Sequence, residues 1–516
     1  MVGEKASLKI DDGELNGSVE GKTRRFLGIP YAKPPVEELR WKRPEKPAKW
    51  SSARDATKYG KRCAQNKSDV LQNPASADED CLYLNVWAPP ASEKKALPVM
   101  FWIHGGGNVN GSASEIVPYA PLDSGYYFYD GKKLAEKGVV VVTFNYRLGV
   151  FGFLSHPSLD EEDAPAGNQG MWDQVAALEW VKANIAKFGG DPKNVTIFGE
   201  SAGSYDVCML VASPKTQGLF HKAISQSGGC TTITGTKQQG EATSLVLATN
   251  LGCEGDDAAT CLREQSVADL LAASAAIPPS ATIRALGPTV DGDFMPDQPR
   301  TLFKSGEVNQ VPYMLGSNHD EGTLFTAGST VPDEAAFLES LKAYSILEEP
   351  LKELYAVSKF EDGKPNPAHA ASARVAGDSR LVCTTTDTAI LASAHMPVYT
   401  YNFNIPIDES LSPVWLGSTH GAELVYVFQT SPSFMAPQTS TSNLMQRYWT
   451  NFAKSGDPNS GDDPEWPTYS AEDDQRMNIT LEESAAVSDF RKAECDLWRM
   501  GYEATFAAAQ TPAAAP

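Results

Sequence analysis

The stretch Val195-Thr-Ile-Phe-Gly-Glu-Ser-Ala-Gly203 decides the fold that this sequence predicts. Its first four residues have the apolar character of a buried strand, and a helical pattern runs from Ser204 to about Ala212. The glycine-flanked segment between them must reverse the chain sharply. Side chains two positions before and after Ser201 would collide with the strand and the helix, so both positions favour glycine. The pattern therefore predicts a strained turn that exposes the Ser201 hydroxyl.

Taken alone, this pentapeptide is weak evidence, because a plain glycine turn has the same letters. The rest of the chain adds alternating strands and helices. Apolar or alternating runs predict strands at 82–87, 99–103, 138–146, 195–198, 223–228, 312–316 and 398–403, and apolar residues at helical spacing predict helices at 172–188, 204–212 and 443–453. Such alternation predicts an α/β protein with a large, mostly parallel sheet covered by helices on both faces. A serine at a strand–turn–helix junction in such a sheet is the nucleophile elbow of the α/β-hydrolase fold.

The 516 residues are expected to form one catalytic domain over residues 1–505. Two helix-rich stretches without strong strands, at about 232–286 and 326–395, are interpreted as insertions that form a cap over the strand ends. The alanine-rich end, residues 506–516, is expected to be a disordered tail.

The composition limits the classes of function. Acidic residues outnumber basic ones by 65 to 44, which gives a formal net charge of −21 at pH 7. Such a chain repels phosphate backbones and anionic surfaces, so nucleic-acid binding and membrane docking are not expected. No run of 18 apolar residues predicts a membrane span, and the N-terminus lacks the apolar core of a signal peptide. No metal-ligand spacing, phosphate loop or dinucleotide motif is present, so no metal or cofactor is expected. We also expect a monomer that acts on a small molecule.

A serine nucleophile needs a base, and in α/β-hydrolases the base is a histidine late in the chain. Three of the seven histidines precede or adjoin the elbow: His104, His156 and His221. The remaining candidates are His319, His369, His395 and His420, of which His369 and His395 lie in alanine-rich, helix-like segments. His420 lies in a glycine-flanked loop after the 398–403 strand, which is where a sheet of this kind presents catalytic groups. His420 is therefore the predicted base for Ser201.

The acid that orients the base is expected after a strand between Ser201 and His420. The loop Gly316-Ser-Asn-His-Asp-Glu-Gly322 follows such a strand and offers both Asp320 and Glu321, with His319 alongside. A solvated acidic turn would have the same residues. Chemistry alone leaves the choice between the two carboxylates open.

An oxyanion hole requires backbone N–H groups that point at the developing charge. Ala202 follows the nucleophile and supplies one of them. The glycines Gly105, Gly106 and Gly107 directly follow the 99–103 strand. Without a Cβ atom they can turn their N–H groups toward the same point.

The sequence resembles the type-B carboxylesterase and cholinesterase family of α/β-hydrolases. The matching stretches extend over nearly the whole chain: Phe26-Leu-Gly-Ile-Pro-Tyr31, Glu79-Asp-Cys-Leu-Tyr-Leu-Asn85, His104-Gly-Gly-Gly107, Asn145-Tyr-Arg147, Gly167-Asn-Gln-Gly170, Phe188-Gly-Gly-Asp-Pro192, Gly199-Glu-Ser-Ala-Gly203, Asp320-Glu-Gly322, His420-Gly421, Asn451-Phe-Ala-Lys-Ser-Gly-Asp-Pro-Asn459 and Trp466-Pro467. The resemblance implies that Glu321 is the acid and His420 the base. It implies an oxyanion hole at Gly106, Gly107 and Ala202.

The resemblance also implies three disulfides among the eight cysteines: Cys63–Cys81, Cys253–Cys261 and Cys383–Cys495. Cys208 and Cys230 are left over and are expected to be buried thiols. Three disulfides suggest an oxidising compartment. We therefore expect a secreted or periplasmic protein whose signal peptide has been removed, with a cytoplasmic location as the alternative.

Two regions bear on the substrate. The loop between Cys63 and Cys81 contains no tryptophan, whereas cholinesterases place there the aromatic residue that binds the quaternary ammonium of choline. Choline-ester specificity is therefore not expected. The segment 112–130 carries four tyrosines: Tyr119, Tyr126, Tyr127 and Tyr129. They either line the entrance of the site or form a packed surface loop.

The sequence thus predicts a serine carboxylesterase that works through an acyl-enzyme. One alternative is a lipase or a hydrolase of bulky or polymeric esters on the same fold. A less favoured alternative is a non-catalytic adhesion protein, because such relatives typically lack the nucleophile or the base that this chain retains.

Overall fold

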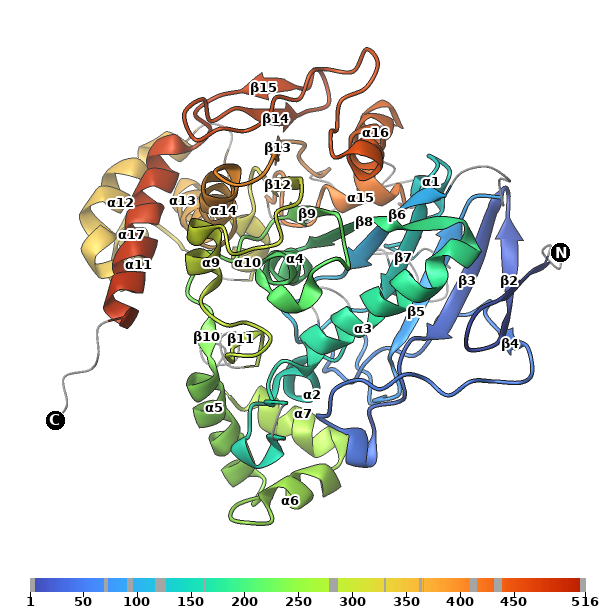
Figure 1. Ribbon diagram of the computed structural model, residues 1–516. Helices are drawn as coiled ribbons and strands as arrows, with labels where there is room; N and C mark the ends of the chain where they lie inside the picture. Colours follow the sequence, from blue (N-terminus) through green and yellow to red (C-terminus); the bar gives the residue numbers. More distant parts are fainter. Residues whose placement is uncertain are drawn as a thin grey trace.

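The computed structural model describes residues 5–68, 73–90, 96–116, 127–161, 164–277, 286–328, 331–361, 364, 366–408, 415–430 and 439–510. Over these residues one large twisted sheet runs through the molecule, and helices lie on both of its faces (Figure 1). The predicted α/β class is confirmed.

The strand order in the sheet is β1-β2-β3-β5-β7-β6-β8-β9-β12-β13-β14-β15, with β4 beside β2. The bounds are β1 Lys5–Lys9, β2 Glu14–Glu20, β3 Thr23–Pro30, β4 Arg54–Asp55, β5 Tyr83–Ala88, β6 Leu97–Ile103, β7 Val140–Phe144, β8 Gly190–Glu200, β9 Lys222–Gln226, β12 Tyr313–Asn318, β13 Val398–Phe403, β14 Arg476–Ile479 and β15 Ala485–Val487. Each neighbouring pair from β7 to β14 is parallel, and the other pairs along this order are antiparallel, whereas the short β4 pairs with β2 in parallel. A short second sheet joins β10, Gly235–Thr236, to β11, Thr289–Val290.

The central strands are apolar throughout because both faces of the sheet are covered. In β6, Val99, Phe101 and Ile103 belong to one hydrophobic core. Met100 and Trp102, which alternate with them, belong to the core on the opposite face. Successive side chains of a strand point to opposite faces, so one continuous apolar run serves both cores.

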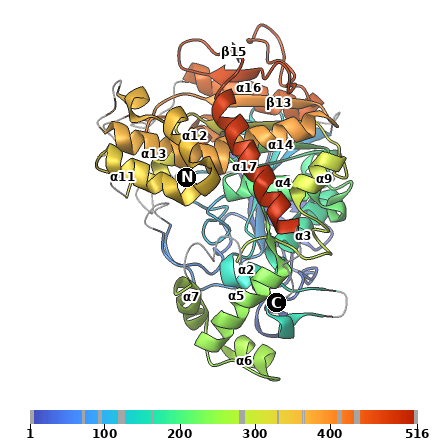
Figure 2. The ribbon, with the colours of Figure 1, turned by 90° about the vertical axis from the view of Figure 1, so that its left-hand side faces the viewer.

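The helices fall into a layer on each face of the sheet and two outer groups. Their bounds are α1 Lys132–Ala135, α2 Gly149–Phe153, α3 Gln169–Asn184, α4 Ala202–Ala212, α5 Lys237–Asn250, α6 Ala258–Glu264, α7 Val267–Ala275, α9 Pro299–Ser305, α10 Gly322–Thr326, α11 Glu334–Leu341, α12 Glu348–Leu354, α13 Pro367–Gly377, α14 Cys383–Ser393, α15 Leu424–Phe428, α16 Thr439–Ser455 and α17 Lys492–Gln510. Helices α5 to α7 form one outer group and α11 to α13 the other, as Figure 2 shows. No helix in the described ranges is both long and apolar enough to cross a membrane.

The C-terminal segment differs from the expectation. The chain continues past the predicted helix at 443–453 into the long helix α17, so residues 506–510 are helical rather than disordered. The Phe506 side chain is buried beneath the Arg300 guanidinium group, 5.6 Å from it. Alanine is the strongest helix former, so an alanine-rich end continues a helix once such an anchor holds it. Residues 511–516 lie outside the described residues.

All eight cysteines form disulfides, which corrects the expectation for Cys208 and Cys230. These two are bonded to each other, in addition to the three expected pairs. Their Cα atoms lie 5.7 Å apart because α4, which carries Cys208, lies against β9, after which Cys230 follows. That distance suits a disulfide, and it follows from the packing of the two elements rather than from the sequence.

Candidate active site

Ser201 lies at the apex of the turn between β8 and α4, with φ 58° and ψ −122°. A left-handed φ is costly for a residue with a side chain, and such strain concentrates at functional sites. The two flanking glycines permit the turn. A Cβ atom on Gly203 would lie 2.1 Å from the Ile103 carbonyl oxygen, and one on Gly199 would lie 2.5 Å from the Gly203 carbonyl oxygen.

The structure brings Glu321 and His420 together from two neighbouring parallel strands, β12 and β13. His420 Nδ1 donates to Glu321 Oε2 at 2.6 Å, and the Asn318 N–H donates to Glu321 Oε1 at 2.7 Å. Both side chains are almost completely buried. In the neutral imidazole Nδ1 carries the proton, which leaves Nε2 as the acceptor nitrogen. Nε2 lies 3.0 Å from Glu200 Oε1, and among the described residues no hydrogen bond joins it to Ser201.

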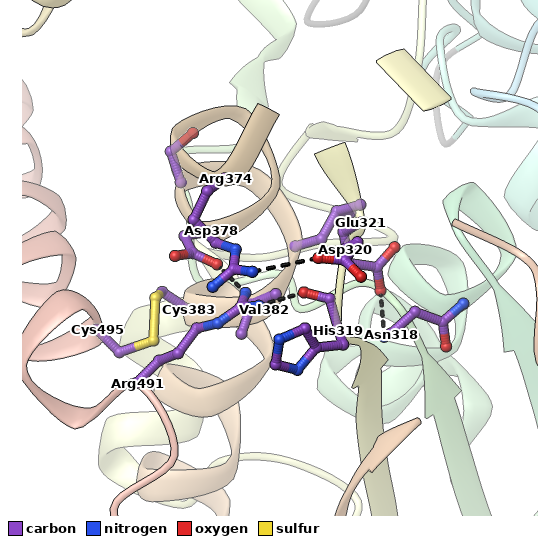
Figure 3. Close-up of polar contacts among 12 residues, drawn as sticks. Asn318, His319, Asp320, Glu321, Arg374, Asp378, Val382, Cys383, Arg491 and Cys495 are labelled. Atoms are coloured by element: carbon purple, nitrogen blue, oxygen red, sulfur yellow. Dashed lines mark hydrogen bonds and ion pairs between the residues drawn. A yellow bond between two sulfur atoms is a disulfide. The ribbon is translucent and has the colours of Figure 1, made fainter. Parts of the chain in front are cut away.

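Asp320, the other candidate acid, points toward Arg374 (Figure 3). Its carboxylate accepts hydrogen bonds from the Ser418 N–H at 3.0 Å and from Arg374 at 3.2 Å. Geometry therefore distinguishes the two carboxylates that the sequence chemistry left open. Glu321 contacts the histidine, and Asp320 does not.

The glycine triplet lies directly against the elbow. A Cβ atom on Gly105 would lie 3.0 Å from Ser201 Cβ. Gly106 and Gly107 have φ values of 106° and 67°, so each has a backbone conformation that favours glycine. In the described part of the chain no backbone acceptor binds the N–H of either glycine. Ala202 begins α4, so its N–H has no acceptor within the helix.

Glu200 is a site residue that the sequence reasoning missed. Its Oε1 lies 3.0 Å from His420 Nε2, and its side chain is 7% exposed. Burial raises the pKa of Glu200 to about 8, against the opposing effect of His420. Its position inside the elbow, next to Ser201, was the signal that could have identified it.

The side chains of Glu200 and Glu321 both raise the pKa of His420. Burial by itself would lower the pKa of His420, but Glu200 and Glu321 outweigh burial and raise the pKa to about 9. An imidazole between two carboxylates is therefore well suited to gain a proton.

A third buried acid, Glu423, lies next to the site residues. Glu423 accepts hydrogen bonds from Gln226 at 3.0 Å and from the Asn318 side chain at 2.6 Å. The Trp449 indole N–H donates to Gln226 at 3.0 Å. Burial raises the pKa of Glu423. This chain of hydrogen bonds joins the ends of β9 and β12, which carry Gln226 and Asn318, to Trp449 of α16.

The aromatic side chains near the site differ in exposure. Tyr129 is buried against Trp102, with ring centroids 4.9 Å apart, and Tyr127 lies 4.3 Å from the Tyr59 ring. Tyr129 and Tyr127 therefore each pack against another aromatic side chain. The other two tyrosines of this segment, Tyr119 and Tyr126, lie outside the described residues. The Phe325 ring is 45% exposed and lies 5.0 Å from the His420 ring. An exposed phenyl group beside the predicted base is available to contact an apolar substrate.

Known proteins resemble this chain over nearly its full length. The profile of the carboxylesterase family matches residues 4–498. The cholinesterase of Mus musculus is 35% identical over 93% of this chain and 83% of its own length. The fumonisin B1 esterase of Sphingopyxis macrogoltabida is 35% identical over 89% of this chain and 83% of its own length. The solved structure of a PNB esterase has a TM-score of 0.79 and 34% identity, and the alignment covers 95% of this chain and 99% of that chain. This chain therefore belongs to the type-B carboxylesterase family of α/β-hydrolases and is a carboxylic ester hydrolase.

Proposed function

We propose that this esterase works through an acyl-enzyme, with Ser201 as nucleophile, His420 as general base and Glu321 as the acid that orients the base. The observation that carries the proposal is the 2.6 Å hydrogen bond from His420 Nδ1 to Glu321. In the neutral imidazole it leaves the buried Nε2, which lies 3.0 Å from Glu200 of the elbow, as the proton acceptor.

In the first half of the reaction, His420 takes the Ser201 proton while Ser201 Oγ attacks the ester carbonyl carbon. Collapse of the tetrahedral intermediate expels the alcohol, which takes a proton from His420, and leaves the acyl group on Ser201. In the second half, His420 takes a proton from water while the water oxygen attacks the acyl carbonyl carbon. Collapse of this second tetrahedral intermediate breaks the bond to Ser201 Oγ, which takes the proton back from His420, and releases the acid. Glu321 stabilises the imidazolium that forms at each stage.

The oxyanion formed in each half is stabilised by the N–H groups of Gly106, Gly107 and Ala202. The free N–H groups of the two glycines and the start of α4 beside Ser201 support this assignment. Loss of one such donor typically costs about 10²–10³ in kcat.

The test compares wild type with Ser201→Ala on a short-chain aryl ester. We expect the variant to keep the wild-type circular dichroism spectrum and melting temperature and to lose turnover. A fluorophosphonate probe should label the wild type at Ser201, as peptide mass spectrometry would show. Retained turnover in the folded variant contradicts the proposal.

The substrate preference follows from the loop between Cys63 and Cys81. The names of the relatives indicate different ester substrates. The Cys63–Cys81 loop of this chain has no tryptophan to bind choline. We expect aryl and short-chain aliphatic esters to be cleaved faster than choline esters. A panel that varies acyl length and alcohol size, and includes emulsified triglycerides, separates an esterase from a lipase.

Four disulfides support an oxidising compartment. The monomeric state stays a prediction, which light scattering of the purified protein would test.

A further inference from the structure

Asp320 has no part in the proposed chemistry, yet it is almost completely buried next to Glu321. Its backbone N–H donates to the Ser418 carbonyl oxygen at 2.9 Å, and its carboxylate accepts the Ser418 N–H at 3.0 Å. Ser418 is two residues before His420. Asp320 therefore joins the turn that carries the proposed acid to the loop that carries the proposed base.

The carboxylate of Asp320 is itself held by the outer helices. Arg374 of α13 donates to Asp320 Oδ1 at 3.2 Å (Figure 3). Helix α13 lies tightly on this turn, since a Cβ atom on Gly322 would lie 1.8 Å from the Ala373 carbonyl oxygen. Arg491 donates to the His319 carbonyl oxygen. Two guanidinium groups thus hold the turn, one at His319 and one at Asp320.

The environment keeps Asp320 charged. Burial by itself would raise the pKa of this carboxyl, but His319, Arg374, Arg491 and the Ser418 N–H together outweigh burial and lower the pKa. A charged acceptor makes a stronger hydrogen bond to a backbone N–H than a neutral one does. The contact with Ser418 is therefore a charge-assisted hydrogen bond between two buried residues.

The loop before His420 is shaped to receive this carboxylate. Gly417 has φ 57°, and a Cβ atom there would lie 2.4 Å from Asp320 Oδ2. Thr323 donates to the Leu416 carbonyl oxygen at 2.7 Å, and the Asn318 side chain donates to the Thr419 carbonyl oxygen at 2.7 Å. Asp320 thus gives the His420 loop a charged contact, and the same carboxylate also binds Arg374 of α13.

We propose that Asp320, held by Arg374, is a positioning residue that sets the place of the His420 loop relative to Glu321 and Ser201. The inference rests on the proposed function of those three residues. It means that helix α13, outside the sheet, is coupled to the catalytic histidine through Arg374, Asp320 and Ser418. A change in this ion pair should alter the rate of the chemical steps more than substrate binding.

The variants separate the two contacts of the carboxylate. Asp320→Ala removes both. Asp320→Asn keeps an acceptor for the Ser418 N–H but loses the charge, and Arg374→Gln keeps the carboxylate but removes its partner. Asp333→Asn is the matched control, because Asp333 also accepts a backbone N–H, that of Ala336, but at the exposed start of α11.

The measurements are kcat and KM for an aryl ester, the rate of Ser201 labelling by the fluorophosphonate, and the melting temperature. Displacement of a catalytic group by about 1 Å can cost about 100-fold in rate. We expect Asp320→Ala to lower kcat by about 10- to 100-fold with little change in KM. Asp320→Asn and Arg374→Gln should lower kcat less, and the double variant should be no slower than Asp320→Asn alone, because the two residues act as a unit. The control should match wild type.

A purely structural role would lower the melting temperature and leave kcat, measured well below that temperature, unchanged. Folded Asp320→Ala with the kcat and labelling rate of wild type overturns the inference. If Asp320→Ala does not fold, Asp320→Asn and Arg374→Gln decide, and wild-type kcat in both overturns it. Failure of the proposed function is a different result, since Ser201→Ala would then retain turnover.

Discussion

Ser201 occupies a backbone conformation that its own side chain disfavours, and the surrounding residues make that conformation possible. Gly199 and Gly203 leave no room for a Cβ atom, because the Gly203 and Ile103 carbonyl oxygens already fill the space. Glu200, between the glycine and the serine, places a buried carboxylate 3.0 Å from His420 Nε2. At this scale a few atoms control both the exposure of the nucleophile and the charge of the base.

Replacement of Gly203 by alanine should disrupt the elbow. The new methyl group would lie 2.1 Å from the Ile103 carbonyl oxygen, so the strand or the helix must shift. We expect a loss of about 1–3 kcal/mol in the free energy of unfolding and a severe loss of kcat. Urea denaturation and turnover measure the two effects. Gly328→Ala is the control, because that glycine has open space around its Cβ position, and equal behaviour of the two variants would count against this account.

Removal of the Glu200 charge should change the pH dependence of turnover. Glu200 helps to raise the pKa of His420 to about 9. A base must be neutral to accept a proton, so a raised pKa restricts activity to higher pH. In Glu200→Gln the pKa of His420 falls, and the acid limb of the kcat/KM profile should move to lower pH. An unmoved limb, or one displaced to higher pH, would show that Glu200 does not set the charge of His420.

At the scale of elements, the site is built where strands β8, β12 and β13 end at the same edge of the sheet. Parallel pairing aligns these ends, so Glu200 of the elbow and Glu321 both contact His420 although they are distant from it in sequence. Disulfides tie the elements together around the sheet. Cys208 joins α4, the helix that follows the nucleophile, to the segment after β9.

The Cys208–Cys230 disulfide yields a direct prediction. Protein denatured without reductant should contain no free thiol, whereas buried thiols at these positions would give two. Replacement of both residues by alanine should lower the free energy of unfolding by roughly 3 kcal/mol, from the loop-closure entropy of a separation of 22 residues. The pair Cys253–Cys261, with a separation of 8, should cost less when replaced in the same way. Guanidinium denaturation measures both losses, and the reverse order would contradict the loop-closure explanation.

The molecule as a whole carries a large negative charge, and its outer helices take part in the site. The formal net charge of −21 is spread over a chain whose exposed ion pairs individually contribute little. Repulsion among the excess carboxylates therefore opposes the compact state. Among the outer helices, α13 reaches this turn directly, since its Arg374 donates a hydrogen bond to Asp320, the residue before Glu321.

Salt should stabilise this protein. Screening shortens the range of charge repulsion to about 10 Å at 0.1 M ionic strength. We expect the melting temperature at pH 7 to rise as sodium chloride increases from about 0.01 M to about 0.15 M. Differential scanning calorimetry measures the shift, and potassium chloride at the same ionic strength serves as a control. A lower melting temperature would mean that the ion pairs, which salt weakens, outweigh the net repulsion.

The sequence by itself determined the class of the fold, the elbow and the order of the candidate residues. These features depend on local physics: a buried parallel strand must be apolar, and a sharp turn must have glycine. The resemblance then selected Glu321 as the predicted acid.

Only the tertiary structure decided the rest. It placed the Asp320 carboxylate on Ser418 and Arg374 and the Glu321 carboxylate on His420, brought Glu200 to His420, bonded Cys208 to Cys230 and packed Phe506 beneath Arg300. Each of these contacts joins residues whose separation in space depends on how whole elements pack. Neither spacing nor composition encodes that separation, because the direction of a side chain is set by neighbours far away in the sequence.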